Sequence, residues 1–205
     1  INLIHKKTPD TFYYFEARAE FIDRELAHAF TKIPCALQIG LQSAQEEVLK
    51  AVHRPFNKKQ FTKNIGLLNQ EGVIFFLFLI YGLPFETFKT FCQGIDYAIS
   101  LYPNNLEIFC LSVLPGTDLY DRAKELKLTF STTPPYNVIH TNVFSQTDIQ
   151  NAKGLSNACS IFYNQGRAVP WFNSVCSVLR LRPSEFFKRF AKDYDTVNNK
   201  IADIT

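Results

Sequence analysis

The residues best suited to chemistry lie in four short segments, each at the end of an apolar run. They are Glu16 within FYYFEARAE, IGLQS at 39–43, IYGLP at 80–84 and LPGT at 114–117. In parallel α/β folds, sites form at the carboxyl ends of the strands, so these segments are predicted to meet at one edge of a sheet. No single segment is diagnostic, since Gly and Pro are common at any strand exit.

The cysteines and histidines do not form a metal-binding motif. The sequence has no C-x-x-C, and its five cysteines are Cys35, Cys92, Cys110, Cys159 and Cys176. Free cysteines are usually buried thiols, which favours a reducing cytoplasm. The histidines have no accompanying ligand pattern, and we interpret them as surface or structural: His5, His28, His53 and His140.

The elements that must position these segments alternate between strands and helices. Strands are predicted at 12–21, 35–42, 73–82 and 106–114, from their aromatic and β-branched content. Helical patterns follow at 23–32, 44–53, 58–71, 86–101 and 118–126. This order favours an α/β fold of parallel strands joined by right-handed crossovers. Beyond Lys127 we expect an irregular segment, then helices at 147–165, 170–181 and 184–197.

Alternation within the second strand predicts a polar interior. Gln38, Gly40 and Gln42 share one face, and the opposite face is apolar. Four strands cannot close a barrel, for which about eight is usual. The fold class is therefore α/β, a partial (β/α) barrel of about four parallel βα units followed by a helical region. We expect a barrel part at 1–130 and a mostly helical extension at 131–205.

Local signals predict several helix ends. Ser43 and Glu46 have capping-box spacing, which favours an N-cap role for Ser43. Asn57 is predicted to cap the next helix, and Gly72 suits the position just after its end. Ser145 resembles a further N-cap.

Composition excludes several classes of protein. The chain has 205 residues, and 22 Lys and Arg against 19 Asp and Glu give a net charge of +3. This is too weak to indicate nucleic acid as a partner, and no apolar run is long enough for a membrane span. There are 20 Phe and no Met, so we expect the chain to be a piece of a longer protein.

Taken in order, three segments resemble the later half of the radical SAM catalytic domain. They are IGLQSAQEEVLKAVHRPFNKKQF, LIYGLPFET and LSVLPGTDLY, and the resemblance covers about residues 11–120. The branch it resembles includes oxygen-independent coproporphyrinogen oxidase, the tRNA methylthiotransferases and the cobalamin-binding radical SAM proteins. The last group includes proteins described as magnesium-protoporphyrin ester oxidative cyclase.

The resemblance implies roles in binding S-adenosylmethionine. Glu16 matches the acid that holds its amino group, Gln42 a residue near the ribose, and Arg54 the base that pairs with its carboxylate. Ile80 matches an apolar contact to the adenine, and Ser112 a position whose backbone meets the adenine. A zwitterion needs an acid and a base at fixed separation, which is consistent with this set.

Two further positions complete the cofactor-binding candidates. Gln38 stands where many relatives carry Glu, and Ser43 follows Gln42 directly. Phe78 departs from the family pattern, because it stands where relatives have a ribose-binding Asp.

Each candidate also has a purely structural alternative. Glu16 could pair with Arg18 or Arg54 inside the barrel, because buried carboxylates are usually paired. Gln42 could be a satisfied core amide, and Arg54 a solvated cation at a helix end.

The resemblance implies a radical SAM iron–sulfur oxidoreductase with a 4Fe–4S cluster, and it leaves cobalamin open as a further cofactor. The family's C-x-x-x-C-x-x-C loop is not in the sequence, so the cluster ligands are expected upstream and this chain alone is expected to be inactive. An electron donor for the cluster is an expected partner. The sequence does not identify the substrate. An unpaired first strand allows a dimer through the sheet edge.

Two alternatives remain open. The first is a scaffold or binding module that kept the barrel and lost the cluster. The second is a doubly wound nucleotide-binding domain, disfavoured because neither G-x-G-x-x-G nor a P-loop motif is present. In the helical tail, Arg167 and Trp171 are either part of a packed cap or of a substrate-side lid.

Overall fold

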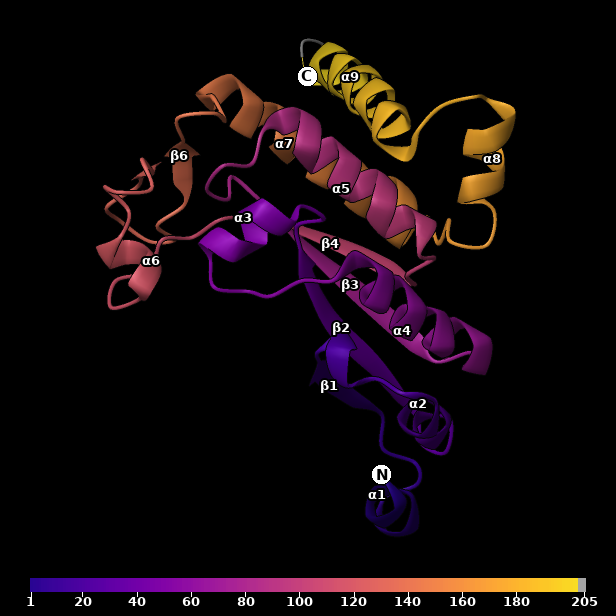
Figure 1. The fold of residues 1–205 in the computed structure, drawn as a ribbon. Helices are drawn as coiled ribbons and strands as arrows, with labels where there is room; N and C mark the ends of the chain where they lie inside the picture. Colours follow the sequence, from indigo (N-terminus) through magenta and orange to yellow (C-terminus); the bar gives the residue numbers. More distant parts are fainter. Residues whose placement is uncertain (203–205) are drawn as a thin grey trace.

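The structure is a computed structural model that describes the backbone of residues 1–202 and the side chains of residues 1–194. The N-terminus and the last described helix, Pro183–Ala202, lie at opposite ends of the molecule (Figure 1). The elements occur in the order α1 (Asn2–Lys7), β1 (Tyr13–Ala17), α2 (Arg24–Phe30), β2 (Cys35–Gln42), α3 (Glu46–Ala51), α4 (Lys58–Glu71), β3 (Ile74–Tyr81), α5 (Phe88–Ser100), β4 (Asn105–Cys110), α6 (Asp118–Asp121), β5 (Thr129–Phe130), β6 (Val138–His140), α7 (Gln146–Ala158), a π-helical segment (Cys159–Gln165), α8 (Phe172–Val178) and α9 (Pro183–Ala202).

The centre of the molecule is an open sheet of four parallel strands in the order β1-β2-β3-β4. Each strand is joined to the next through at least one helix, as parallel pairing requires. The predicted α/β fold class is therefore confirmed, with the four strands forming part of a barrel and the helical region following. Whether the boundary between these parts lies at 130/131 stays a prediction, and residues 203–205 lie outside the described residues.

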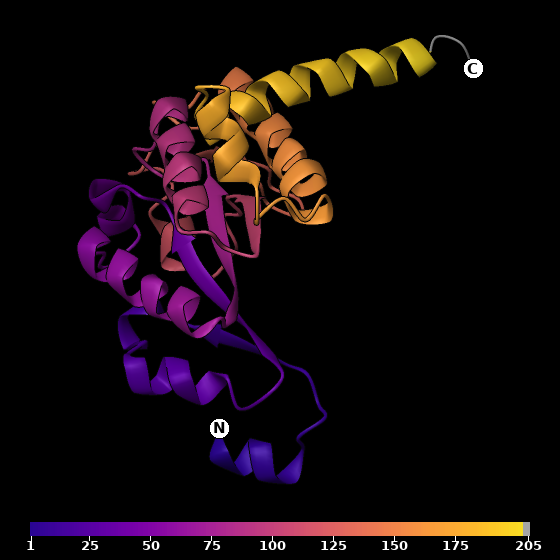
Figure 2. The ribbon, with the colours of Figure 1, turned by 90° about the vertical axis from the view of Figure 1, so that its right-hand side faces the viewer.

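The two faces of the sheet differ in exposure. One face is the core, where alternate strand residues such as Leu37, Ile39, Phe75 and Leu77 are fully buried. Helices α4 and α5 pack on β3, and α7 on β4. On the other face, strand side chains stay partly exposed, and Figure 2 shows its lower part free of helices. This open face is the predicted interior.

Several local signals have the predicted effect. The Asn57 side chain accepts a hydrogen bond from the backbone of Gln60, so Asn57 caps α4. Gly72 ends the same helix in the left-handed region, at φ 69°. Ser145 caps α7 in a capping box with Asp148. These interactions join neighbours in sequence, which is why spacing alone reveals them.

The outer edge of β4 is closed by side chains instead of a strand. The Asn164 amide accepts from the Leu106 backbone N–H at 2.9 Å and donates to the Leu106 carbonyl at 3.0 Å. Ser156 donates to the Ile108 carbonyl at 2.7 Å. The Asn164 amide forms the two hydrogen bonds that a peptide group of a fifth strand would form. The backbone groups of Leu106 at this edge therefore have partners. By contrast, β1 has β2 as its one strand neighbour in the described structure.

Several predicted elements are shorter than expected, among them the helices predicted at 44–53 and 170–181, which are Glu46–Ala51 and Phe172–Val178. The strand predicted over 12–21 ends at Ala17 and continues as a 3₁₀ turn at Ala19–Phe21, where Asn64 of α4 donates to the Ala19 carbonyl. The helix predicted over 118–126 is regular only at Asp118–Asp121. The strand predicted to reach residue 114 ends at Cys110, because the chain beyond it pairs antiparallel with the segment around Asn137. Residues 147–165 form α7 and then a π-helical segment.

Candidate functional site

The open face carries a pocket at the carboxyl ends of β1, β2 and β3. Its volume is about 470 Å³, which lies in the range of small-molecule sites. Five of the seven predicted cofactor-binding residues line it: Glu16, Gln38, Gln42, Arg54 and Ile80. The other lining residues are Ala17, Arg18, Gly40, Phe78 and Phe109. The sheet has therefore brought together residues that are far apart in the sequence, from Glu16 to Phe109.

The pocket has a polar half and an apolar half. Glu16, Gln38 and Arg54 come from β1, β2 and the loop after α3. Phe78 and Phe109, from β3 and β4, form the opposite half with Ile80, and their rings stack at 5.9 Å with an interplanar angle of 8°. Such a pocket can hold a molecule that is charged at one end and flat or apolar at the other.

Gln42 is held in an uncommon backbone conformation at the end of β2. Its φ is 61°, a region that non-glycine residues enter rarely. The register with β3 shifts between Gly40 and Gln42, which leaves Leu41 bulged. Bulges of this kind often redirect a side chain beside a site. The Gln42 amide folds over Gly40, where an added Cβ would lie 2.6 Å from it.

The Gln42 amide is buried and incompletely bonded. Its Oε1 atom has no hydrogen-bond partner in the described part of the chain. The alternative that Gln42 is a satisfied core amide is therefore wrong. A buried acceptor without a donor costs about 1–3 kcal/mol.

Arg54 is a half-buried guanidinium that reaches back to β2. It donates to the Gly40 carbonyl at 2.7 Å, and burial lowers its pKa from the ordinary value. Because α3 ends at Ala51 and the side chain turns into the pocket, the alternative of a solvated helix-end cation is wrong. A guanidinium has five N–H donors, so several stay available for a carboxylate.

Glu16 faces the pocket and stays exposed to solvent. The alternative that it pairs with Arg18 or Arg54 does not hold among the described residues, because Arg18 instead contacts Glu20 at 3.3 Å. Gln38 lies beside Glu16 in the register of β1 with β2. The pocket therefore presents a carboxylate and a guanidinium that are not neutralised by each other.

Two predicted residues lie elsewhere. Ser43 is not an N-cap: Gln45 occupies that position of α3, and the buried Ser43 hydroxyl donates to Glu86 at 2.7 Å. The capping box does not form because α3 begins only at Glu46, and the Ser43 hydroxyl instead accepts from the Gln45 backbone N–H at 3.2 Å, two residues further on. Ser112 lies beyond the end of β4, and its hydroxyl bonds to Asn137 at 3.0 Å. Neither lines the pocket.

Sequence reasoning missed Glu86, the most buried acid of the described residues. It is 1% exposed, and burial raises the pKa of its carboxyl to about 8, partly offset by the Ser43 hydrogen bond. Its Oε2 atom has no partner in the described part of the chain. Perturbed acids often mark functional regions. No local pattern could reveal it, because burial depends on neighbours far away in sequence.

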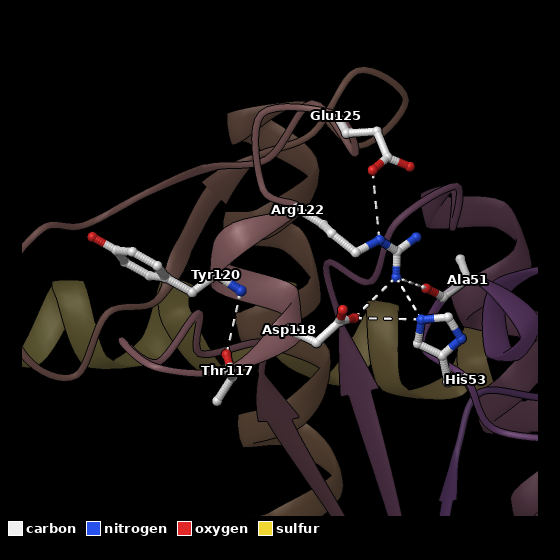
Figure 3. A network of polar contacts seen from close by, with 7 residues as sticks. All are labelled: Ala51, His53, Thr117, Asp118, Tyr120, Arg122 and Glu125. Atoms are coloured by element: carbon white, nitrogen blue, oxygen red, sulfur yellow. Dashed lines mark hydrogen bonds and ion pairs between the residues drawn. The ribbon is translucent and has the colours of Figure 1, made fainter.

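A polar network ties two strand-exit loops together beside the pocket (Figure 3). One Arg122 nitrogen donates to the Ala51 carbonyl at 3.3 Å and contacts His53 at 2.9 Å and Asp118 at 3.1 Å. It thereby joins the end of α3 to α6. His53 directly precedes Arg54, so this network holds the loop that delivers Arg54 to the pocket.

The residues singled out in the tail lie away from the pocket. Trp171 stacks edge-on against Phe162, and Asn173 of α8 donates to the Ile99 carbonyl near the end of α5. Tyr163 donates to the Pro103 carbonyl, just before the start of β4. These contacts place α8 at the amino end of the sheet, opposite the pocket, which favours the packed cap over the lid.

The described residues fit one of the two implied cofactors. The partnerless Gln42 oxygen, the Arg54 guanidinium and the apolar half suit a nucleoside bearing an amino acid. They do not fit an iron–sulfur cluster: no group of His, Cys, Asp or Glu within the described residues could hold a metal. Burial also raises the pKa of all five cysteine thiols, which disfavours the thiolate form that iron requires.

Fold and pocket together define an α/β protein with part of a radical-SAM-type barrel. The solved structure of the radical S-adenosylmethionine methyltransferase TsrM from Kitasatospora setae, with cobalamin and a 4Fe–4S cluster bound, shares this fold. Its TM-score is 0.53 at 16% identity, over 70% of this chain and 30% of that one. This likeness concerns the fold alone.

Curated proteins match part of the sequence. The heme chaperone HemW of Buchnera aphidicola is 28% identical over 90 residues, 44% of this chain and 23% of that protein. The oxygen-independent coproporphyrinogen III oxidase of Helicobacter pylori is 34% identical over 82 residues, 38% of this chain and 18% of that protein. The chain thus spans less than a quarter of the length of these relatives. Residues 124–202 match the family described as protein of unknown function (DUF4080).

Taken together, these matches confirm the predicted resemblance to radical SAM proteins. None of the described helices has the length and apolarity that crossing a membrane requires.

Proposed function

We propose that the pocket binds S-adenosylmethionine and that the chain contributes this half of the site to a radical SAM iron–sulfur oxidoreductase. The observation that carries the proposal is one pocket that holds the Glu16 carboxylate and the Arg54 guanidinium, not paired with each other, opposite an apolar half. Arg54 would bind the carboxylate, Glu16 the amino group and the apolar half the adenine. When bound together with a cluster, this cofactor supplies radical chemistry that begins with one electron from the cluster.

The proposal places the cluster ligands outside these 205 residues. It includes an electron donor as partner and the cytoplasm as compartment, which suits five free thiols. The finer version, a cobalamin-dependent protein similar to magnesium-protoporphyrin ester cyclase, rests on the sequence resemblance. The chain alone should not cleave S-adenosylmethionine after iron–sulfur reconstitution; release of 5′-deoxyadenosine in that assay would contradict the proposal.

A non-catalytic scaffold is the second candidate, and Phe78 favours it. Phe78 stacks on Phe109 where relatives carry an acid for the ribose, so this part of the pocket cannot accept hydrogen bonds from sugar hydroxyls. A scaffold would keep the folded sheet without binding the cofactor. The two candidates therefore differ in whether a nucleoside that carries an amino acid binds.

Calorimetric titration with S-adenosylhomocysteine separates the candidates. We expect the wild-type chain to bind this probe and Arg54→Met to bind it about 30-fold to 100-fold more weakly, because a charge-assisted bond to the carboxylate is lost. Arg24→Met, an exposed change on α2, serves as the matched control and should leave affinity unchanged. A folded wild-type chain that does not bind the probe at millimolar concentration would favour the scaffold.

The free edge of β1 also supports the proposed dimer. A parallel strand with one neighbour leaves a row of backbone groups open to pairing. Light scattering that shows a clean monomer at high concentration would exclude it.

A further inference from the structure

Glu86 and Gln42 lie on neighbouring strand exits and share an unusual property. In the part of the chain that the structure describes, the two buried side-chain atoms without a hydrogen-bond partner are Gln42 Oε1 and Glu86 Oε2. Ser43 connects them: it follows Gln42 in the chain, and its hydroxyl donates to Glu86 Oε1 at 2.7 Å. Both Ser43 and Glu86 are 1% exposed.

The Ser43 hydroxyl organises the turn that follows β2. It accepts a hydrogen bond from the backbone of Gln45 at 3.2 Å while it donates to Glu86. The Ser43 backbone N–H also closes a tight turn onto the Leu41 carbonyl at 2.8 Å. This turn holds Gln42 at φ 61°, so it must compensate for an unfavourable backbone conformation.

Glu86 itself sits on a rigid support. The turn before it contains Gly82 at φ 83°, where an added Cβ would lie 2.4 Å from Val138 of β6, so glycine is required there. After Glu86, α5 begins with a capping box formed by Thr87 and Thr90. The carboxyl is therefore fixed by its own backbone and can serve as an anchor for the β2 exit.

We propose that Glu86 is a positioning residue: through its hydrogen bond with Ser43 it fixes the bulged β2 exit and thereby the Gln42 amide in the pocket wall. Its consequence for ligand binding rests on the proposed function. Burial raises the pKa of the Glu86 carboxyl to about 8, so this acid is mostly neutral at pH 7. Because its Oε1 atom accepts from the Ser43 hydroxyl, the proton lies on Oε2. Glutamine reproduces this arrangement of acceptor and donor, and leucine, which is of similar size, does not.

Hydrogen exchange tests the anchor without any ligand. In Glu86→Leu the amides of residues 41–46 should exchange at least tenfold faster than in the wild type, and in Glu86→Gln within twofold of it. If Glu86→Leu does not fold, Ser43→Ala takes its place in the test. It removes the hydroxyl donor and should give the same faster exchange. Residues 156–166 serve as the internal control. Equal protection of residues 41–46 in the wild type, Glu86→Leu and Ser43→Ala would overturn the proposal, as would a loss of protection in Glu86→Gln.

Titration with S-adenosylhomocysteine then tests the consequence. We expect at least tenfold weaker binding in Glu86→Leu, restored to within twofold of the wild type in Glu86→Gln. Suppose that the amides of residues 41–46 exchange faster in Glu86→Leu while its affinity for the probe is unchanged. That result would overturn the claim that the anchor positions Gln42 for the ligand. If the wild type does not bind the probe, the proposed function fails, and the exchange result still decides whether Glu86 anchors the turn.

Discussion

Replacing Glu86 by Gln should make the folding stability of this chain much less dependent on pH between about 5 and 8. Burial raises the pKa of this carboxyl from 4.5 to about 8 in the folded state. Its contribution to stability is therefore fully present below about pH 4.5, falls as the pH rises, and is lost by about pH 8. At about 1.4 kcal/mol per pH unit, the full loss is on the order of 5 kcal/mol, reduced if the loop relaxes.

Urea unfolding at pH 5, 6, 7 and 8 measures this effect. Fluorescence of the single tryptophan, Trp171, reports unfolding because its ring, although 41% exposed, packs edge-on against Phe162 in the folded tail. The wild-type curve should fall with pH, and the Glu86→Gln variant should be more stable than the wild type at pH 8. Burial also raises the pKa of Glu107. This carboxyl therefore leaves a smaller decrease of stability with pH in both proteins.

The control for this prediction is Glu25→Gln, an exposed carboxyl on α2. It should leave the pH dependence of the wild type in place. Parallel curves for the wild type and Glu86→Gln would show that the carboxyl ionises at an ordinary pKa, and the account of its burial would then be wrong.

The second large effect is expected at the closed edge of β4. Asn164→Ala should lower the free energy of unfolding by roughly 2–4 kcal/mol, because the Leu106 N–H loses its partner and the Leu106 carbonyl keeps only the Cys159 thiol as a weak donor at 3.6 Å. The same amide also donates to Glu107 at 3.3 Å. The π-helical segment places this side chain against the strand.

Chemical denaturation with Asn157→Ala as the matched control tests this idea. Asn157 is an exposed amide on α7, and its loss should change the free energy of unfolding by less than about 0.5 kcal/mol. An equally small change for Asn164→Ala would mean that water satisfies the edge of β4 as well as the amide does.

Local patterns in the sequence were sufficient for the strands, the fold class and half of the site. Alternation in β2 put Gln38 and Gln42 on the open face, because side chains of a strand point to opposite sides with a period of two. The caps at Asn57 and Ser145 were readable because a cap joins residues three positions apart. The resemblance added Glu16, Arg54 and Ile80, which the pocket then brought together.

The sequence by itself thus determined the order of strands and helices and which face β2 buries, and its resemblance to a family indicated which acid, base and amide share the pocket. Only the tertiary structure decided that the Ser43 hydroxyl donates to Glu86, that the Ser112 hydroxyl donates to Asn137, and that the Asn164 amide bonds to the edge of β4. The physical reason is the same in each case. These partners are 43, 25 and 58 positions apart, and a buried polar group takes the best partner that folding brings near.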